Sequence, residues 1–207
     1  TIPALSTTGE VNITIAGDAV NEYDETIIIA LAANTNCTVG SPGTLTLTIT
    51  DNSDVPEVGF ASSNSAESES STTRSIVVNL GDGENTKSGK EITIPYTFAT
   101  STTTNTGATK DHNLDEGNTI IPVGSSTATI SIVFQQDLIY EGTEDLVIEL
   151  GTPDLGTDGL AAATLDGDAF QHTFTVTSID DPPAVKFSSE NGSLTEDDDD
   201  SHELLGL

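Results

Sequence analysis

Apolar and polar residues alternate over short stretches along most of this chain. Two such stretches, 11–15 and 127–134, are each followed by a second alternating stretch, at 26–31 and 145–150. Alternation with a period of two is typical of β-strands that bury one face in a core. No long stretch has the 3.6-residue period of an amphipathic helix. The pattern therefore predicts an all-β protein. Further strands are expected at 44–50, 58–60, 74–80, 91–99, 119–123 and 173–178.

The two pairs of alternating stretches enclose the same acidic motif, D-x3-E-x2-E. It runs from Asp18 to Glu25 in the first copy and from Asp137 to Glu144 in the second, 119 residues later. We expect the motif to connect two antiparallel strands, which would hold three carboxylates at one end of a sheet. Crowded carboxylates repel one another unless a cation lies among them, and Ca²⁺ accepts several oxygen ligands from flexible loops. This acidic loop is therefore the first candidate functional site.

The internal repeat divides the 207 residues into tandem units. Residues 1–55 are interpreted as the C-terminal part of one domain, 56–182 as a complete domain, and 183–207 as the N-terminal part of a following one. The boundaries fall at the acidic, turn-rich segments 51–56 and 179–183, and the opening Pro56–Phe60 is restated by Pro183–Phe187. Counterparts of about 81–119 are missing from the two partial units, so the tail of one chain could not complete the head of another.

Short strands with turn signals and no helices favour antiparallel β-sandwiches of the immunoglobulin-like kind. Tandem sandwiches stack end to end, with their loops at the two ends. This arrangement places each acidic loop beside the linker that leaves the same domain.

The charge of the chain excludes two classes of partner. The formal net charge is -29, from 34 acidic and 5 basic residues, which argues against binding to nucleic acid or to anionic membranes. No apolar run approaches the length of a membrane span, so none is expected in this stretch. The simplest alternative interpretation of the acidity is that it provides solubility alone.

Residues that could carry catalysis are sparse. The histidines His112, His172 and His202 have no metal-ligand spacing and are interpreted as solvent-exposed loop residues, and no nucleophile elbow occurs. Paired carboxylates could serve glycoside hydrolysis, but here they recur in tandem beside linkers, which favours ligation of a cation. The single cysteine, Cys37, allows no intramolecular disulfide. The sequence therefore predicts a protein that is not an enzyme, and a disulfide-free domain fits a bacterial surface protein better than a secreted animal one.

Three segments together resemble the Calx-beta domains of sodium/calcium exchangers, integrin β4 and many bacterial surface proteins. They are the acidic loop at 137–144, the closing Ile179-Asp180-Asp181-Pro182, and the opening Pro-x-Val-x-Phe with Glu67 seven residues further on. The resemblance implies immunoglobulin-like sandwiches of about seven strands each. In calcium-binding members of the family the ion lies at the end of the sandwich where these loops and the linker meet.

The resemblance also implies a set of metal ligands, carried over position by position. In the complete domain they are Glu67, Asp111, Asp137, Glu141, Glu144, Asp180 and Asp181. In the first unit they are Asp18, Glu22, Glu25, Asp51 and Asp54.

This sequence departs from the family pattern at two places. Asp111-His112 stands where the family often has Asp-Tyr, and Gln136-Asp137 supplies one carboxylate where an acidic pair is common. Fewer carboxylates indicate one ion instead of several, and weaker binding. The linker at 51–56 also resembles the calcium linker of cadherins, but the D-x3-E-x2-E loop has no place in that family.

These observations lead to one functional hypothesis and two alternatives. The hypothesis is an extracellular or cell-surface array, structural or adhesive, whose domain junctions are stiffened by Ca²⁺. Its expected partners are neighbouring repeats, further copies in a filament or surface layer, and an adhesion target that the sequence does not identify. The alternatives are a metal-independent structural subunit of an extracellular filament or matrix, and a regulatory calcium sensor.

Overall fold

The computed structural model describes residues 2–51, 55–70, 72–81, 87–104, 106 and 110–187. Strands and loops make up all of this part of the chain, and it contains no helix. The strands are β1 (Glu25–Ala30), β2 (Thr44–Ile49), β3 (Glu57–Phe60), β4 (Asn64–Ser68), β5 (Thr73–Leu80), β6 (Ile92–Phe98), β7 (Gly117–Ile121), β8 (Thr127–Val133), β9 (Thr143–Leu150), β10 (Thr164–Leu165) and β11 (Gln171–Thr177). The predicted all-β fold is confirmed.

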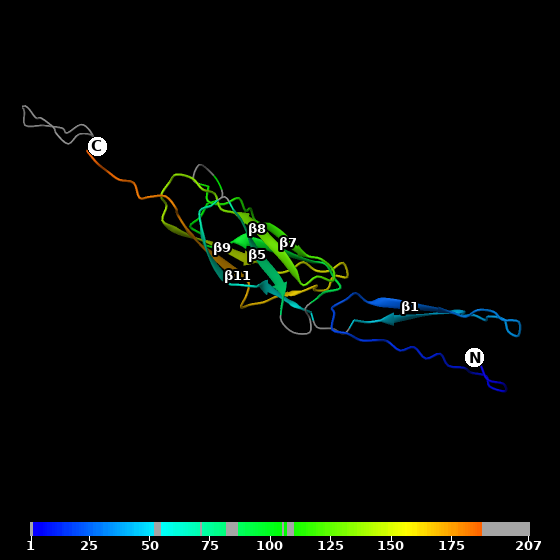
Figure 1. Ribbon diagram of the computed structural model, residues 1–207. Helices are drawn as coiled ribbons and strands as arrows, with labels where there is room; N and C mark the ends of the chain where they lie inside the picture. The colour runs from blue at the N-terminus through cyan, green and yellow to red at the C-terminus, as the bar shows by residue number, and fades with distance from the viewer. Residues whose placement is uncertain are drawn as a thin grey trace, which may run out of the picture.

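Strands β3 to β11 form a two-layered β-sandwich (Figure 1). One sheet has four strands in the order β10-β3-β5-β8, and the other has five in the order β4-β11-β9-β6-β7. Most neighbouring strands are antiparallel, as expected, but β10 pairs with β3 and β4 pairs with β11 in parallel. The fold is thus an immunoglobulin-like sandwich that is antiparallel except at these two edge pairs.

The apolar positions of the alternating stretches fill the space between the two sheets. On β8 and just beyond it, Ile130, Ile132 and Phe134 are at most 3% exposed, and on β9 Leu146 and Ile148 are fully buried. Burying an aliphatic or aromatic side chain of this size contributes roughly 1.5–3 kcal/mol. The alternation seen in the sequence therefore identifies the core-facing side of these strands correctly.

Among its described residues, the N-terminal unit has one pair of strands, the antiparallel hairpin β1-β2. The strand predicted at 11–15 does not form, and Val11 and Ile13 are 72% and 39% exposed. The reason is the lack of a partner: the matching strand β8 pairs with β5, and a counterpart of β5 at the 119-residue offset would precede residue 1. Alternation alone cannot make a strand without a neighbour to accept its hydrogen bonds.

Two further features differ from the sequence-based expectations. The acidic loop does not join two strands of one antiparallel pair, because β8 pairs with β5 while β9 pairs with β6 and β11 in the other sheet. The polar segment after β3, for which no strand was predicted, contains β4, whose backbone pairs with β11. Alternation shows which face of a strand is buried but not which strand lies beside it, and a polar edge strand has little apolar alternation to detect.

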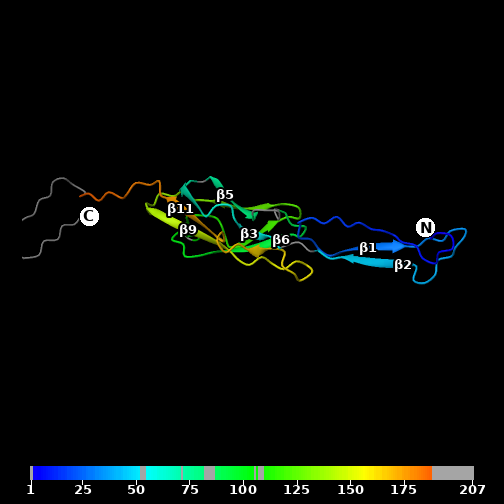
Figure 2. The ribbon, with the colours of Figure 1, turned by 90° about the horizontal axis from the view of Figure 1, so that it is seen from below.

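The two ends of the sandwich carry different segments. In both views the β1-β2 hairpin projects from one end, and the chain that follows β11 leaves from the opposite end (Figures 1 and 2). Residues 183–187 form no strand, and the remainder of the predicted third unit, 188–207, lies outside the described residues. Nowhere in the described chain is there a helix long and apolar enough to cross a membrane.

Candidate metal centre

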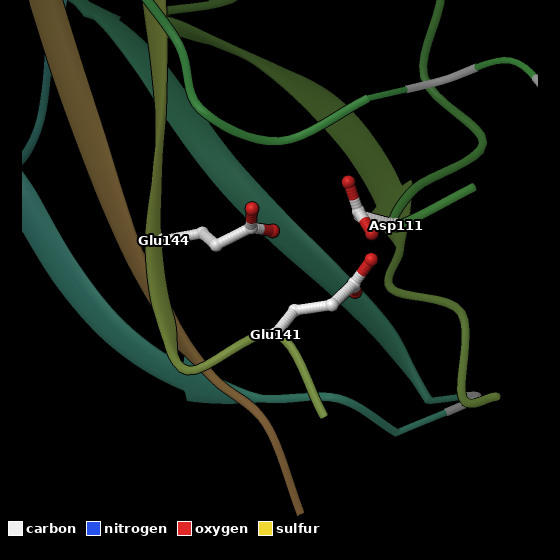
Figure 3. Close-up of side chains that lie close together, drawn as sticks. All are labelled: Asp111, Glu141 and Glu144. Carbon is white, nitrogen blue, oxygen red and sulfur yellow. The ribbon is translucent and has the colours of Figure 1, made fainter. Parts of the chain in front are cut away.

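Three carboxylates converge at the end of the sandwich from which the chain leaves. Oxygen atoms of Asp111, Glu141 and Glu144 all lie within 4.8 Å of one another, and Figure 3 shows the three side chains pointing toward a common centre. Glu144 is the second residue of β9, and Glu141 lies in the loop that precedes this strand. Between them Gly142 adopts a φ of +86°, a left-handed conformation that suits glycine. This turn brings both glutamates to the same point.

Asp111 reaches the cluster from a separate loop. Its backbone N–H donates to the Thr104 carbonyl over 2.9 Å, and its own carbonyl accepts from the Gln135 N–H over 2.7 Å. Its carboxylate accepts a further hydrogen bond from the Thr104 N–H. Asp111 is 4% exposed, so these backbone contacts fix a charged group in a buried position.

The carboxyl groups of the cluster resist simultaneous ionisation. Burial raises the pKa of Glu141 to about 7, with the charge of Asp111 and a hydrogen bond to it acting in the same direction. Burial also raises the pKa of Glu144, and Asp111 and Glu69 add to that effect. The Oε2 atom of Glu141 is buried and has no hydrogen-bond partner among the described residues. Without a cation, this site therefore holds negative charge at a cost in free energy.

A second group of carboxylates extends the site toward the linker. Glu69 is 4% exposed and accepts a 3.1 Å hydrogen bond from the Ser178 hydroxyl. Burial raises its pKa, and the charges of Asp137 and Asp180 raise it further. The Oδ2 atom of Asp180 is buried and unpaired within the described part of the chain. Asp137 and Asp180, both named as ligands from the sequence, therefore lie in the same electrostatic environment as Glu69.

Two of the sequence-named residues of this domain belong to neither of these two groups of carboxylates. Glu67 forms an ion pair with Arg74 of β5, and Asp181 is exposed. Glu69, two residues further on, lies in the acidic region instead, and its N–H donates to the Thr177 carbonyl beside the linker. One signal in the sequence could have indicated this difference, namely Arg74, the basic residue that pairs with Glu67.

The N-terminal unit brings its own acidic residues together around an open pocket of about 270 Å³. The pocket is lined by Asp18, Glu22, Glu25 and Asp51, among others. Asp18 accepts from the Val20 N–H over 2.9 Å, and Asp137 accepts from the Ile139 N–H over 2.7 Å in the same way. The loop turn thus repeats between the units. Asp54, the fifth residue named for this unit, lies outside the described residues, and a counterpart of Asp111 would precede residue 1.

The two described histidines, His112 and His172, do not lie in exposed loops as the sequence interpretation expected. His112 is 1% exposed and His172 is 2% exposed, while His202 is outside the described residues. His112 packs edge-on against Phe98 with ring centroids 5.4 Å apart, and His172 packs in the same manner against Phe174 at 4.7 Å. Aromatic packing explains their burial, and scattered positions in the sequence could not reveal it. Burial lowers the pKa of His112, although neighbouring Asp111 opposes that effect.

The donor set fits a hard divalent cation. The atoms that converge are carboxylate oxygens, and no histidine or cysteine belongs to the cluster found in the described chain. Oxygen ligands from flexible loops suit Ca²⁺, whereas sites for softer transition metals contain nitrogen or sulfur. The unpaired buried oxygens of Glu141 and Asp180 are ready acceptors for such an ion.

The sequence matches the model of the Calx-beta domain over residues 5–53 and again over 51–182. Comparison with curated proteins finds no match. Among solved structures, the apo form of the Calx CBD1 domain is 16% identical with a TM-score of 0.46, covering 61% of this chain and all of that one. CBD12 from CALX1.2 is 17% identical with a TM-score of 0.46, covering 59% of this chain and 44% of that one. The calcium binding domain CBD12 of CALX1.1 is 17% identical with a TM-score of 0.47, covering 76% of this chain and 69% of that one.

Proposed function

Because the chain belongs to the Calx-beta domain family, we propose that its complete domain binds Ca²⁺ through the acidic cluster at the end of the sandwich. The observation that carries the proposal is the convergence of Asp111, Glu141 and Glu144 within 4.8 Å. Two buried carboxylate oxygens nearby, on Glu141 and Asp180, have no partner among the described residues. A cation at this point would accept the unpaired oxygens as ligands and offset the burial and the repulsion by Asp111 that raise the pKa of Glu141.

The same site explains how calcium would act on the junction between domains. Asp180 belongs to the linker that leaves the domain, and the neighbouring Ser178 N–H donates to the Gly142 carbonyl of the acidic loop over 2.9 Å. An ion held by Asp111, Glu141 and Glu144, with Asp137, Glu69 and Asp180 around it, would tie the linker to the loop. We propose that calcium binding thereby restricts the angle at which the next unit leaves.

The wider role we propose is that of an extracellular or cell-surface array, structural or adhesive, built from such domains. Two family matches within one chain and the net charge of -29 support it. Extracellular calcium modules bind with dissociation constants of about 10⁻⁴ to 10⁻³ M, which calcium outside cells can saturate. The proposed partners are neighbouring repeats and further copies in a filament or surface layer, together with an adhesion target of unknown chemistry.

Calx-beta domains are binding and regulatory domains, and we propose no catalytic role for this chain. The cluster residues are suited to ligation, since their carboxylate oxygens converge within 4.8 Å and one of them, on Glu141, is buried without a partner among the described residues.

Calorimetric titration of Ca²⁺ into the 207-residue protein tests the proposal directly. We expect saturable binding, and a melting temperature about 10 °C higher at 100 times the dissociation constant than in EGTA, because that excess contributes about 2.7 kcal/mol. The double variant Glu141→Gln, Glu144→Gln should lose the binding assigned to the complete domain. Asp181→Asn, which removes an exposed carboxylate outside the cluster, is the matched control and should bind as the parent does.

An absence of binding, with the same melting curve in calcium and in EGTA, would contradict the proposal. It would leave the alternative of a metal-independent structural subunit. Binding that survives in the Glu141/Glu144 variant but disappears in Glu22→Gln, Glu25→Gln would move the site to the N-terminal unit.

A further inference from the structure

The acidic loop of the N-terminal unit docks onto the base of the sandwich that follows it. Asn21 is 3% exposed and forms a parallel bridge with Ser88. The Gly89 N–H donates to the Asn21 carbonyl over 2.9 Å, and the Asn21 side-chain amide donates to the Ala162 carbonyl over 3.2 Å. A single residue of the loop is therefore buried by segments from two separate parts of the next domain.

A buried lysine completes this joint. Lys90 is 3% exposed, and its Nζ lies 3.0 Å from a carboxylate oxygen of Asp158 and 5.1 Å from the centre of the Tyr23 ring. The Tyr23 hydroxyl accepts from the Thr157 N–H over 3.4 Å. The joint thus consists of hydrogen bonds and a cation–π contact between protein groups, and the Lys90–Asp158 ion pair within the sandwich holds the lysine in place.

Within the described part of the chain, the corresponding loop of the complete domain has no such partner. At the offset of 119 residues, Leu138, Ile139 and Tyr140 take the places of Ala19, Val20 and Asn21. They are 91%, 43% and 47% exposed, whereas Ala19 and Val20 are half-buried and Asn21 is buried. Both loops start with the same aspartate turn, so the backbone presents the three residues in the same way.

These three residues form an exposed apolar tip beside the exit of the chain. The Ser178 N–H donates to the Gly142 carbonyl, which holds the loop against the strand from which the linker departs. Single exposed apolar residues are ordinary on protein surfaces, but three adjacent ones at a domain end indicate a contact surface. A unit that starts after this linker would meet the tip first.

We propose that Leu138, Ile139 and Tyr140 dock onto the base of a following domain of this family, the unit whose opening we predict at Pro183. The base is the surface equivalent to 88–90 and 156–162, and its counterparts would follow residue 207. The Tyr140 carbonyl takes the place of the Asn21 carbonyl in the backbone bond, and the larger side chains at 138–140 bury apolar area where the first joint uses polar contacts. The two joints therefore share their backbone pairing and differ in side-chain chemistry.

The occupant is a following domain and not a second copy of this chain. The base of the complete domain is already covered by Asn21 and Tyr23 of its own N-terminal unit, so another copy has no free base to offer. The inference rests on the tandem arrangement of the proposed function, but not on its calcium, because the contacts described for the first joint are made by side chains and backbone groups outside the acidic cluster.

The test is a chain in which a second copy of 56–182 replaces residues 183–207, so that the added copy presents a free base. Hydrogen exchange measured by mass spectrometry on the first copy's peptide spanning 135–145 reports the docking, in calcium and in EGTA. The added copy carries Tyr140→Phe, so that its otherwise identical peptide has a different mass. We expect exchange at 138–142 to be at least about tenfold slower in the extended chain than in the 207-residue protein, in both solutions. The variant Leu138→Ser, Ile139→Ser, Tyr140→Ser should lose this protection. Ile120→Ser, which removes an apolar side chain that is 48% exposed on β7, should retain it.

Equal exchange in the extended and 207-residue proteins would overturn the inference, as would protection that persists in the triple serine variant. Concentration-dependent dimerisation of the 207-residue protein that is lost in the triple variant would also overturn it, because the occupant would then be a second copy. Docking in EGTA together with absent calcium binding would support this inference while contradicting the proposed function, so the two are distinguished.

Discussion

Neighbouring carboxylates of this protein differ in the groups that neutralise them. Glu67 pairs with Arg74, whereas Glu69 is buried and accepts hydrogen bonds from Ser178 and Ile179. Glu141 is opposed by a second carboxylate, Asp111, and its pKa rises to about 7. At the scale of the residue, function therefore depends on which acids remain uncompensated, since these are the groups that gain most from a cation.

The stability of the calcium-free protein should fall as the pH rises. The pKa of Glu141 is raised in the folded state, so the protonated group contributes stability that is fully present below its unfolded pKa of about 4.3 and is lost as the pH rises through about 7. Urea denaturation of calcium-free protein should give a free energy of unfolding up to about 2 kcal/mol larger at pH 5.5 than at pH 8, with solvent screening reducing the difference.

Glu141→Gln should flatten this pH dependence, because the amide does not titrate. Calcium affinity should show the opposite trend and increase over the same interval, since ligation requires the ionised carboxylate. Stabilities of the calcium-free parent and of Glu141→Gln that change equally between pH 5.5 and 8 would contradict the assignment to Glu141. The comparison needs both proteins, because the lowered pKa of buried His112 adds stability to each of them as the pH rises.

The sequence named Glu67 as a candidate ligand, whereas the structure favours Glu69. Variants of these two residues form a matched pair. Glu69→Gln should weaken calcium binding by about tenfold or more, because it removes a buried charge beside Asp137 and Asp180. Glu67→Gln removes a carboxylate that already has a partner, and its calcium isotherm should be unchanged. Calorimetry on both variants decides between them, and a larger effect at Glu67 would restore the assignment made from the sequence.

At the scale of the element, the proposed functions lie in the loops that join the strands. The acidic loop crosses from β8 in one sheet to β9 in the other, so its position depends on both sheets at once. The preceding unit uses the equivalent loop to contact the segment before β6, where Gly89 lies against Glu22. The loop therefore has two roles on two sides, ligation within its own unit and contact with the next.

Gly89→Ala should loosen the joint between the N-terminal unit and the sandwich. An added Cβ would lie 2.6 Å from Glu22 Cγ and 3.2 Å from the Asn21 carbonyl oxygen, so the loop must shift. We expect faster hydrogen exchange at residues 21–23 and at 89, by about tenfold, with little change in the unfolding of the sandwich core. Gly167→Ala is the control, because a Cβ there meets nothing within 4 Å. Unchanged exchange in Gly89→Ala would show that the joint absorbs the extra methyl group.

On the scale of the whole molecule, the chain combines an elongated arrangement with a large uniform charge. The hairpin and the exit of the chain lie at opposite ends of the sandwich (Figure 2), and the net charge is -29. Such a charge opposes compaction and is screened by salt. A general effect of ionic strength must therefore be separated from binding at the cluster.

Monovalent salt and calcium should stabilise the protein in different ways. Raising NaCl from 0.05 to 0.5 M in EGTA should raise the melting temperature by only a few degrees, because it screens surface repulsion. A few millimolar CaCl₂ should exceed that effect, while MgCl₂ at the same ionic strength should not, since Mg²⁺ requires near-octahedral geometry and dehydrates reluctantly. Equal shifts from CaCl₂ and MgCl₂ would indicate charge neutralisation without a specific site.

The sequence by itself determined the fold class, the strands that form the core and the acidic loop. Alternation at 127–134 and 145–150 marks buried faces because side chains on a strand point to opposite sides, and the repeated motif gives Asp137, Glu141 and Glu144 without any coordinates. The Asp111 position came from resemblance to the family, and the structure places it beside both glutamates.

Only the tertiary structure decided which residues meet. In the structure Glu67 pairs with Arg74 while Glu69 is buried in the acidic region, and β8 and β9 belong to different sheets. Residues 11–15 have no partner strand, and His112 and His172 are buried against aromatic rings. Local sequence specifies backbone preference and the face of a strand, which are short-range properties. Sheet partners, burial of polar groups and contacts between units join residues far apart in the chain, and those are fixed by packing.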